Sequence, residues 1–488
     1  MIDMATLVWL AIAIPVAGAV LIVLTGRLAD VREAVTMVTA ILTFMVVVLL
    51  LLPVLAGERP TVILGEPIYG LPLKLTLEPL GMVFALVASL LWMVTSVYSI
   101  GYMRSNREGH QTRYYAFFAV SIASAVGIAF SGNMFTLFVF YEVLTIATYP
   151  LVTHHGNDEA RRGGRTYLGI LLGTSIAFQL LAIIWTWVAT GTLDFRDGGI
   201  LSGHVAGPAL IVLLLLYMYG IGKAALMPLH RWLPAAMVAP TPVSALLHAV
   251  AVVKAGVFTV LKVILYIFGI DLLAETSGSE ILVWLAGITI IVGSLVALRQ
   301  DNIKRRLAYS TVSQLSYVVL GAAILAPISV AGAIIHIAAH AFGKITLFFV
   351  AGSIYTAAHK TLVSELDGIG RRMPWTMAAF AVGSLSMIGL PPTFGFVSKW
   401  YMLQGAMQTE QFIPVAVIVV STLLNAAYFL PILFQAYFKP PPEGSEEHGE
   451  APILMLGALL FTAACTIIFF FAPGIPGILA FMAVGSGG

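Results

Sequence analysis

The fold of this chain is decided by residues 210–228, which read Leu-Ile-Val-Leu-Leu-Leu-Leu-Tyr-Met-Tyr-Gly-Ile-Gly-Lys-Ala-Ala-Leu-Met-Pro. The first half is a long apolar run, as in a membrane-spanning helix. Gly220, Gly222 and Pro228 then surround Lys223 with residues that interrupt helices. Broken helices are tolerated at membrane depth where they line a cavity, and they mark transport sites in many carriers. The stretch therefore predicts a broken helix at a transport site, with a kink that only serves packing as the alternative.

The remainder of the sequence has the same apolar character. Of 488 residues, 60% are hydrophobic and 10% are charged, and the mean hydropathy is +0.98. Soluble chains carry about 25% charged residues, so this composition excludes a soluble globular protein. The net charge of +2 argues against nucleic-acid binding, and a single cysteine, Cys465, excludes an internal disulfide.

We therefore predict an all-α polytopic membrane protein with about fourteen transmembrane helices. The expected helices cover residues 4–25, 33–55, 79–103, 114–131, 133–153, 166–190, 208–228, 243–270, 279–298, 306–326, 329–357, 375–407, 412–438 and 451–472. Alternating apolar residues between positions 59 and 78 predict a short hairpin outside the bilayer. Because no basic stretch or cleavage site precedes Met4, the first helix is expected to be retained. After the last helix, only a tail over residues 473–488 is expected.

The distribution of basic residues predicts the orientation of the chain. Loops after odd-numbered helices hold 17 lysines and arginines, whereas the opposite loops hold only Arg59, Lys74 and Arg196. Cytoplasmic loops are enriched in lysine and arginine, so both termini are expected on the outside of a bacterial or archaeal cytoplasmic membrane. An even number of crossings agrees with this orientation.

Five basic residues remain inside the predicted helices, and all five are lysines: Lys223, Lys254, Lys262, Lys344 and Lys399. A lysine near the middle of a membrane helix costs about 2.5–3.5 kcal/mol on an insertion scale, so such residues usually face the bundle interior or a water-filled path. Arginine stays charged there, whereas a desolvated lysine can exchange its proton. The choice of lysine therefore favours proton transfer.

One carboxylate, Glu142, lies mid-helix in the run Phe138-Val-Phe-Tyr-Glu-Val-Leu144. An unpaired carboxylate in such a place would stay protonated, so Glu142 needs a partner of opposite charge. We predict that this partner is Lys223. The alternative is a buried salt bridge that only fixes helix packing, although buried pairs add little stability.

Histidines also lie within the predicted spans. His336, His340 and Lys344 are spaced by four residues and therefore share one helix face, over about 12 Å at 1.5 Å per residue. Groups of this kind can pass protons through intervening water, and His248, six residues before Lys254, is a further candidate. Histidines that only hydrogen-bond neighbouring helices are the alternative. Zinc binding is disfavoured because no third ligand is evident.

An internal repeat connects the two lysines that follow helix-breaking residues. The sequence Ser-Ala-Leu-Leu-His-Ala at 244–249 is similar to Ser-Thr-Leu-Leu-Asn-Ala at 421–426, an offset of 177 residues. Lys399, which follows Gly389, Pro391, Pro392 and Gly395, lies 176 residues after Lys223. The offset corresponds to five predicted helices, and an odd shift makes the two repeats inverted in the membrane.

Four long motifs now carry a resemblance to a known family. They are residues 219–258 from Tyr-Gly-Ile-Gly-Lys to Lys-Ala-Gly-Val-Phe, 301–314 (Asp-Asn-Ile-Lys-Arg-Arg-Leu-Ala-Tyr-Ser-Thr-Val-Ser-Gln), 336–353, and 389–399 (Gly-Leu-Pro-Pro-Thr-Phe-Gly-Phe-Val-Ser-Lys). In this order they resemble the antiporter-like proton-conducting subunits of respiratory complex I, of Mrp-type multisubunit cation/proton antiporters and of membrane-bound hydrogenases. Within that family, a lysine at position 399 and the short C-terminal tail resemble the Mrp D-type polypeptide.

The resemblance implies two inverted five-helix repeats with broken seventh and twelfth helices. The implied regions are an N-terminal three-helix region (1–113), a first repeat (114–270), a second, inverted repeat (279–438) and a C-terminal loop with the last helix (439–488), each repeat holding a proton half-channel. The resemblance also implies a role for each candidate residue. Glu142 pairs with Lys223, and Lys254 passes protons along the membrane with His248 beside it. The link between the half-channels is formed by His336, His340 and Lys344, and the path ends at Lys399. Lys262 receives no role.

We expect a proton-translocating subunit of a multisubunit Na⁺/H⁺ or K⁺/H⁺ antiporter, working with other hydrophobic subunits in membrane lipid. No catalytic centre, cofactor or metal of its own is expected. A second hypothesis is a pump subunit of complex I (NADH-quinone oxidoreductase) or of a hydrogenase, whose redox centres would lie in partners, because this chain has no cysteine spacing for them. A third, an intramembrane enzyme for lipid-linked substrates, is disfavoured because the ionisable residues are buried mid-span.

Overall fold

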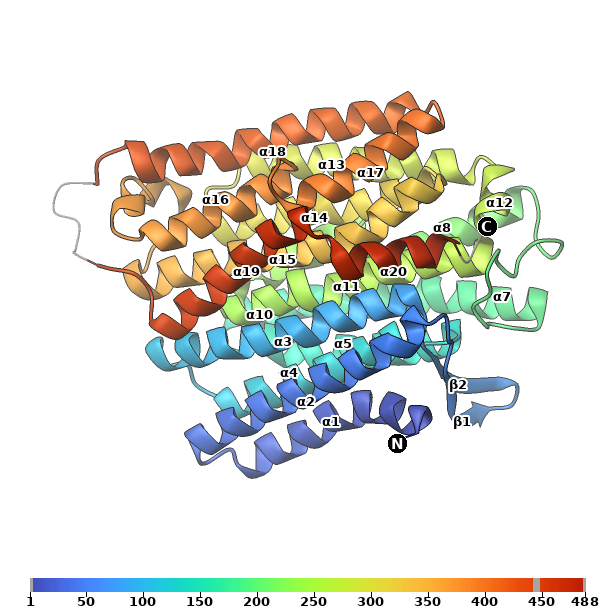
Figure 1. Cartoon of the computed structure of the whole chain (residues 1–488), viewed down its shortest axis with the longest axis horizontal. Coiled ribbons are helices and arrows are strands. Elements are labelled where there is room, and N and C mark those ends of the chain that lie inside the picture. The colour runs from blue at the N-terminus through green and yellow to red at the C-terminus, as the bar shows by residue number, and fades with distance from the viewer. Residues whose placement is uncertain (1–2, 442–447, 486–488) are drawn as a thin grey trace.

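The long apolar runs of the sequence form a bundle of helices in the computed structural model, which describes residues 3–441 and 448–485 (Figure 1). Eleven helices in this part of the chain are long and apolar enough to cross a membrane. Three shorter helices, α8 (Pro208–Gly220), α16 (Pro374–Ile388) and α20 (Gly474–Gly485), are also apolar. Helix α14 (Ile303–Ala323) carries three basic residues in its first turn. The prediction of an all-α polytopic membrane protein is confirmed, and the exception to the all-helical pattern is the predicted hairpin.

The N-terminal part consists of three helices and this hairpin. The elements are α1 (Met4–Leu24), α2 (Ala29–Leu55), β1 (Thr61–Ile68), β2 (Leu71–Thr76) and α3 (Pro79–Ser105). β1 and β2 pair antiparallel, with Thr61 opposite Thr76. The backbone of β2 also bonds the turn before α5, because Thr76 N–H donates to Phe130 O and Gly132 N–H donates to Lys74 O. The hairpin therefore closes one end of the bundle.

The next helices lead to the first break. They are α4 (Gln111–Ala129), α5 (Met134–Val152), α6 (Asp158–Thr174), a π-helical turn (Ser175–Leu180), α7 (Leu181–Thr190) and α8 (Pro208–Gly220). The expected start at residue 166 is wrong by eight residues, because the side chain of Asn157 accepts a hydrogen bond from Ala160 N–H and caps α6 there.

α8 ends at Gly220 rather than continuing to residue 228, so the predicted break is confirmed and begins earlier than expected. Ala225 has a left-handed backbone with φ 56°, which no α-helix accommodates. Only short pieces follow: 3₁₀ turns at Gly222–Ala224, Leu229–Arg231 and Ala236–Val238, and α9 (Trp232–Ala235). The Trp232 indole donates to Gly222 O at 2.9 Å and holds the broken segment together.

The next elements form the centre of the bundle or pack around it. They are α10 (Thr241–Ala245), a π turn (Leu246–Val250), α11 (Val252–Lys262), a second π turn (Val263–Phe268), α12 (Ile270–Ala274), α13 (Gly278–Leu298), α14 (Ile303–Ala323) and α15 (Pro327–Ala358). Every residue from 329 to 354 of α15 is buried. Because α15 contacts α14, α16, α17, α3 and the α10 segment, its position fixes the centre of the bundle.

The second break divides the predicted helix 375–407 into α16 (Pro374–Ile388) and α17 (Phe394–Gln408). Gly389 ends α16 with φ 88°, and a Cβ atom at Gly395 would lie 1.9 Å from Ser386 O. Glycine is therefore required at both positions, because a larger residue would strain the turn or push α17 away. The prediction of a broken twelfth segment is confirmed.

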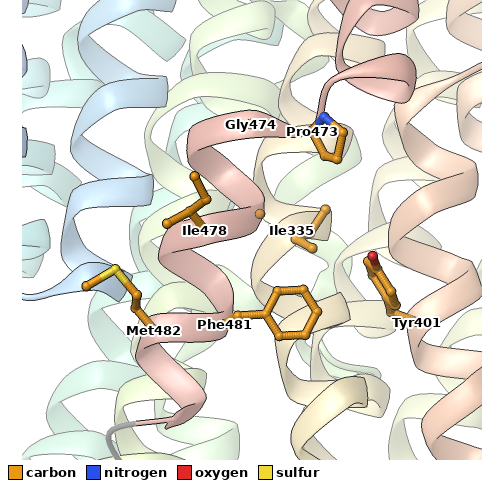
Figure 2. Close-up of a pocket in the computed structure, with 8 residues that line it drawn as sticks. Ile335, Tyr401, Pro473, Gly474, Ile478, Phe481 and Met482 are labelled. Carbon is orange, nitrogen blue, oxygen red and sulfur yellow. The ribbon is translucent and has the colours of Figure 1, made fainter. Parts of the chain in front are cut away.

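The chain continues with α18 (Phe412–Phe438), α19 (Ile453–Phe471) and α20 (Gly474–Gly485). The expectation that only a tail follows residue 472 is wrong, because α20 packs on α15 and α3. A cavity of about 600 Å³ lies beside it, and Figure 2 shows that the Phe481 ring points from α20 toward Tyr401 of α17. Its lining is apolar apart from the Tyr401 hydroxyl, so it offers nothing to a proton pathway.

Loops that the sequence predicts on the basic side of the membrane meet at one end of the bundle. Glu108, His155, Lys304 and Lys360, which come from four of the loops predicted on the basic side, line one cavity. Those loops therefore meet at one end, which we call the basic end. Figure 1 places the hairpin and the chain ends marked N and C toward the opposite end. The side of the membrane that each end faces, and the division into four regions, stay predictions.

Candidate proton-transfer site

All eight residues predicted from the sequence lie inside the bundle, but they do not form one uninterrupted chain. Lys223, Lys254, Lys344, His248 and His336 have no exposed surface. His340 is 1% exposed and Lys399 is 5% exposed, whereas Glu142 is half-buried with its carboxylate oxygens in the interior. Burying an ion costs several kcal/mol, so each of these groups needs polar contacts, and those contacts define the site.

Lys223 reaches α5 through the break after α8. Its Nζ donates to Tyr141 O at 2.8 Å and to Thr145 Oγ1 at 2.6 Å, and it lies 3.1 Å from the centre of the Tyr141 ring. Such cation–π contacts are favourable where the cation is desolvated. An intact helix would carry Lys223 along the axis of α8, so the break is what places the ammonium group on α5.

Glu142 interacts with Lys223 electrostatically but does not bond to it directly. Residues 141 and 145 share one face of α5, and position 142 is turned about 100° away. Within the described residues, neither carboxylate oxygen of Glu142 has a hydrogen-bond partner. The predicted partners therefore interact through their charges, and no direct ion pair joins them.

A first polar series crosses from α11 to α17. Lys254 Nζ lies 2.5 Å from His340 Nδ1 on α15. The rings of His340 and His336 follow with centroids 6.0 Å apart, and His336 Nδ1 lies 2.8 Å from Ser398 Oγ. Ser398 precedes Lys399 in the chain. The predicted stripe on α15 therefore contacts Lys254 of α11 through His340. It contacts Ser398 of α17, in the second broken segment, through His336.

A second polar series connects Lys344 with Lys399. Lys344 Nζ donates to Ser310 Oγ at 2.8 Å, and Ser310 Oγ lies 2.9 Å from the Tyr428 hydroxyl. Tyr428 also hydrogen-bonds Asn425 Oδ1, and the Asn425 amide donates to Met387 O at 3.4 Å. Lys399 Nζ donates to the same carbonyl at 2.7 Å and to Ile388 O at 3.1 Å. These carbonyls end α16, where the helix dipole favours a cation.

His248 is buried but not bonded into either series. Both ring nitrogens lack a hydrogen-bond partner among the described residues, and the ring lies 4.8 Å from that of Phe348, centroid to centroid. A buried imidazole without a partner is costly. Its position beside α15 leaves a gap in the polar path that water could fill.

A family model described as NADH:quinone oxidoreductase/Mrp antiporter, TM, matches residues 131–425, which include all eight residues predicted from the sequence. The chain belongs to this family. The N-type polypeptide of the NADH-quinone oxidoreductase of Desulforudis audaxviator is 34% identical over 400 residues, which are 78% of each chain. The D-type polypeptide of the Na(+)/H(+) antiporter of Alkalihalophilus pseudofirmus is 29% identical over 394 residues, 79% of this chain and 78% of the relative.

The fold of this family member is also found in solved structures. A chain of the Mrp complex from Dietzia sp. superposes with a TM-score of 0.88 at 20% identity, covering 99% of this chain and 97% of the other. A chain of the membrane-bound sulfane sulfur reductase, an archaeal respiratory membrane complex, gives a TM-score of 0.86 at 23% identity, covering 98% and 97%. At these identities the likeness concerns the fold alone, and it agrees with the expected antiporter-like architecture.

The structure gives Lys262 a partner that the sequence did not indicate. Lys262 Nζ forms a buried ion pair with Glu78, the residue before α3, and lies 4.3 Å from the centre of the Phe195 ring. Ser131 O is 3.4 Å from the same nitrogen. This cluster joins α11 to the base of the hairpin, and within residues 3–441 and 448–485 its ammonium group bonds to neither polar series. Lys262 therefore holds helices together at the hairpin end.

The sequence also missed the neutral members of the second series. Ser310, Asn425 and Tyr428 are hydroxyl or amide side chains in apolar helices, a pattern that is common at helix interfaces of any membrane protein. For Asn425 the sequence did contain an indication, because the internal repeat aligns this residue with the candidate residue His248. Within residues 3–441 and 448–485, no three histidine, cysteine or carboxylate side chains form a group that could hold a metal ion.

Tyr428→Phe should slow proton movement between Lys344 and Lys399. The substitution keeps the ring and removes the hydroxyl that bridges Ser310 and Asn425. We expect about tenfold slower proton flux in vesicles that contain the assembled complex, equivalent to about 1.4 kcal/mol in a barrier. Tyr217→Phe is the matched control, because the Tyr217 hydroxyl is also buried but bonds Thr186 outside the series. Equal effects of the two substitutions would contradict a role for Tyr428 in the path.

Proposed function

We propose that this chain is the proton-translocating subunit of a multisubunit monovalent cation/proton antiporter. The observation that carries the proposal is the second polar series, which connects two buried lysines through Ser310, Tyr428 and Asn425. Purely structural lysines need only one counter-charge each, as Lys262 has in Glu78. Lys344 instead bonds the hydroxyl group of Ser310, which bonds that of Tyr428, and both hydroxyls donate and accept, as a migrating proton requires. The last step to Lys399 passes the Met387 carbonyl, which only accepts, so in this proposal water carries the proton there.

The proposed cycle begins at the gap between Glu142 and Lys223. Movement of Glu142 toward or away from Lys223 changes how strongly the lysine holds its proton. The charge of Lys223 then acts on Lys254. The ammonium group of Lys254 can pass a proton directly to His340, because Lys254 Nζ lies 2.5 Å from His340 Nδ1. From α15 the proton reaches Lys399 through Ser398 or through the series from Lys344. The half-channels are assigned to residues 114–270 and 279–438, with His248 as the branch toward the basic end.

The proposed cation is Na⁺ or K⁺, since similar proteins include the Na(+)/H(+) antiporter polypeptide of Alkalihalophilus pseudofirmus and a probable K(+)/H(+) antiporter polypeptide of Rhizobium meliloti. The proposed partners are other hydrophobic subunits in a bacterial or archaeal cytoplasmic membrane, with both termini outside. The test uses vesicles that contain the assembled complex and a pH-sensitive dye. A change of pH inside the vesicles that depends on an Na⁺ or K⁺ gradient supports the proposal. A dye signal that is the same with and without either gradient rejects it.

A second candidate is a subunit of a redox-driven proton pump. It is favoured by the 34% identity with the NADH-quinone oxidoreductase polypeptide of Desulforudis audaxviator and by the 30% identity over 441 residues with Escherichia coli hydrogenase-4 component B. Gentle purification of the tagged chain from its host separates the two candidates. Recovery with small hydrophobic proteins alone supports the antiporter, whereas recovery with flavin, iron–sulfur or nickel proteins assigns the same lysines to a pump.

A further inference from the structure

A polar cavity of about 390 Å³ opens at the basic end of the bundle, away from the two polar series. Its walls come from the end of α3, the turn before α6, the segment before α10, the start of α14 and the end of α15. A cavity of this size and polarity holds several waters. Neither the sequence motifs nor the family match assigns it a role.

Glu108 and His155 line this cavity, and the buried His154 lies behind them. Glu108 Oε2 lies 3.7 Å from His155 Nδ1 and 4.0 Å from His154 Nε2. The Glu108 side chain is 13% exposed and His155 is 37% exposed, so His155 is the member in contact with the aqueous phase. Burial raises the pKa of Glu108, while the His155 and Lys304 charges oppose that rise. The other titratable groups that line the cavity are Tyr102, Glu159, Tyr355 and Lys360.

Two helix faces lead from this cavity to the buried relay. On the α10 segment, Thr241 lines the cavity, and Ala245 and His248 follow at spacings of four and three residues, about 10 Å in total. On α15, Tyr355 and Ala351 line the cavity, and Phe348 and Lys344 follow on the same face. The two segments pack together, and Phe348 lies against His248. Both faces therefore run from the cavity to groups of the relay.

The positive charge beside Glu108 selects the ion that can use this route. Lys304 Nζ donates to Ala239 O at 2.5 Å, so the ammonium group is held in the cavity wall and occupies that carbonyl. Burial lowers the pKa of Lys304 to about 8, so its charge is present at pH 6 and partly lost at pH 8. The Lys304 charge also interacts with His248 electrostatically. A sodium ion needs about six oxygen ligands of its own and is repelled by a neighbouring ammonium. A proton moves between side chains and water and needs no such cage.

We propose that the cavity is the mouth through which protons pass between the basic-end aqueous phase and His248, with Glu108 and His155 as the pair that exchanges them. The inference rests on the proposed function, because it supplies the relay with its connection to water at that end. His155 exchanges protons with solvent, Glu108 stores them inside the cavity, and water beside Ala245 and Ala351 carries them to His248. The nitrogens of His248, which have no partner among the described residues, are the receiving groups.

The first test measures proton flux in vesicles that contain the assembled complex, with the basic end at pH 6 or pH 8. Glu108→Gln should lower the flux about tenfold at pH 8, the lower end of what a charged cleft adds to an association rate. The loss should be smaller at pH 6, because protons are more abundant there and the raised pKa of Glu108 leaves less carboxylate charge for the substitution to remove. Glu108→Asp should restore flux. Asp158→Asn, an exposed carboxylate at the same end outside the cavity, should leave it unchanged.

The second test measures access of water and does not depend on transport. In a Cys465→Ser background, Ala245→Cys should react with a membrane-impermeant thiol reagent added at the basic end. Ala286→Cys on α13 should not react, although both alanines have no exposed surface. If the wild-type complex shows no cation-coupled flux, the proposed antiporter function is rejected. The labelling of Ala245→Cys then decides by itself whether the cavity connects His248 to the aqueous phase.

Four results would overturn the inference. The first is wild-type flux of Glu108→Gln at both pH values, and the second is an equal loss of flux in Glu108→Gln and Asp158→Asn. The third is a Glu108→Gln variant whose KM for Na⁺ changes while its pH profile does not. The fourth is an Ala245→Cys variant that does not react with the thiol reagent. If Glu108→Gln fails to assemble, Glu108→Asp and the labelling decide the question.

Discussion

Replacing Lys223 with alanine should abolish cation-coupled proton exchange, and replacing it with arginine should not restore it. The ammonium group contacts Tyr141 O and Thr145 Oγ1 beside Glu142, so alanine removes the charge on which Glu142 acts. Arginine keeps a positive charge but cannot release its proton in a protein. The measurement is Na⁺- or K⁺-driven pH change in vesicles, with the amount of assembled complex determined in parallel.

Lys74→Ala is the matched control for this experiment. Lys74 bonds Asp194 at 2.9 Å at the hairpin end and is partly exposed, so its loss should leave exchange near the wild-type rate. Wild-type exchange by Lys223→Ala would reject the mechanism. Glu142→Ala should have the same phenotype as Lys223→Ala, with assembly intact, because no hydrogen bond among the described residues depends on its carboxylate.

Lys262→Met should lower stability strongly while sparing transport in the molecules that assemble. It leaves Glu78, 6% exposed, as a buried carboxylate without its cation. Breaking one side of a buried pair typically costs about 3–5 kcal/mol. Thermal unfolding of the detergent-solubilised complex measures the loss.

The double substitution Glu78→Gln with Lys262→Met should recover most of that stability, because it removes both charges together. A single substitution as stable as the wild type would show that the pair is not buried in the assembled complex. Loss of exchange in fully assembled Lys262→Met would show instead that Lys262 belongs to the proton path.

The membrane class and the two breaks could be predicted from sequence because each depends on local composition. Gly220, Gly222 and Gly389 interrupt apolar helices wherever those helices pack, so their effect is visible without a fold. α20 was missed because its 12 residues are shorter than a membrane crossing needs. A search for apolar runs long enough to cross a membrane does not detect short helices that pack against other helices.

The candidate site was predictable in its charged members and not in its connections. A lysine in an apolar helix is expensive, so Lys254 and Lys344 were evident from sequence alone. Their partners depend on which helices meet. The pairing of Lys262 with Glu78, and the bridge from Ser310 to Tyr428, each join distant parts of the chain. The direct Glu142–Lys223 bond was not found because the break after α8 directs the ammonium group to the neighbouring face of α5.

The burial of α15 constrains how this protein can move. Residues 329–354 are all enclosed by other helices, so a shift of α15 would disturb packing on every side. Its backbone amides should therefore exchange with deuterated water more slowly than those of half-exposed α2 or α7. Alternation between the two ends must then come from rotating side chains, rearranging water and the broken segments beside α15, while the helix that carries His336, His340 and Lys344 keeps its place.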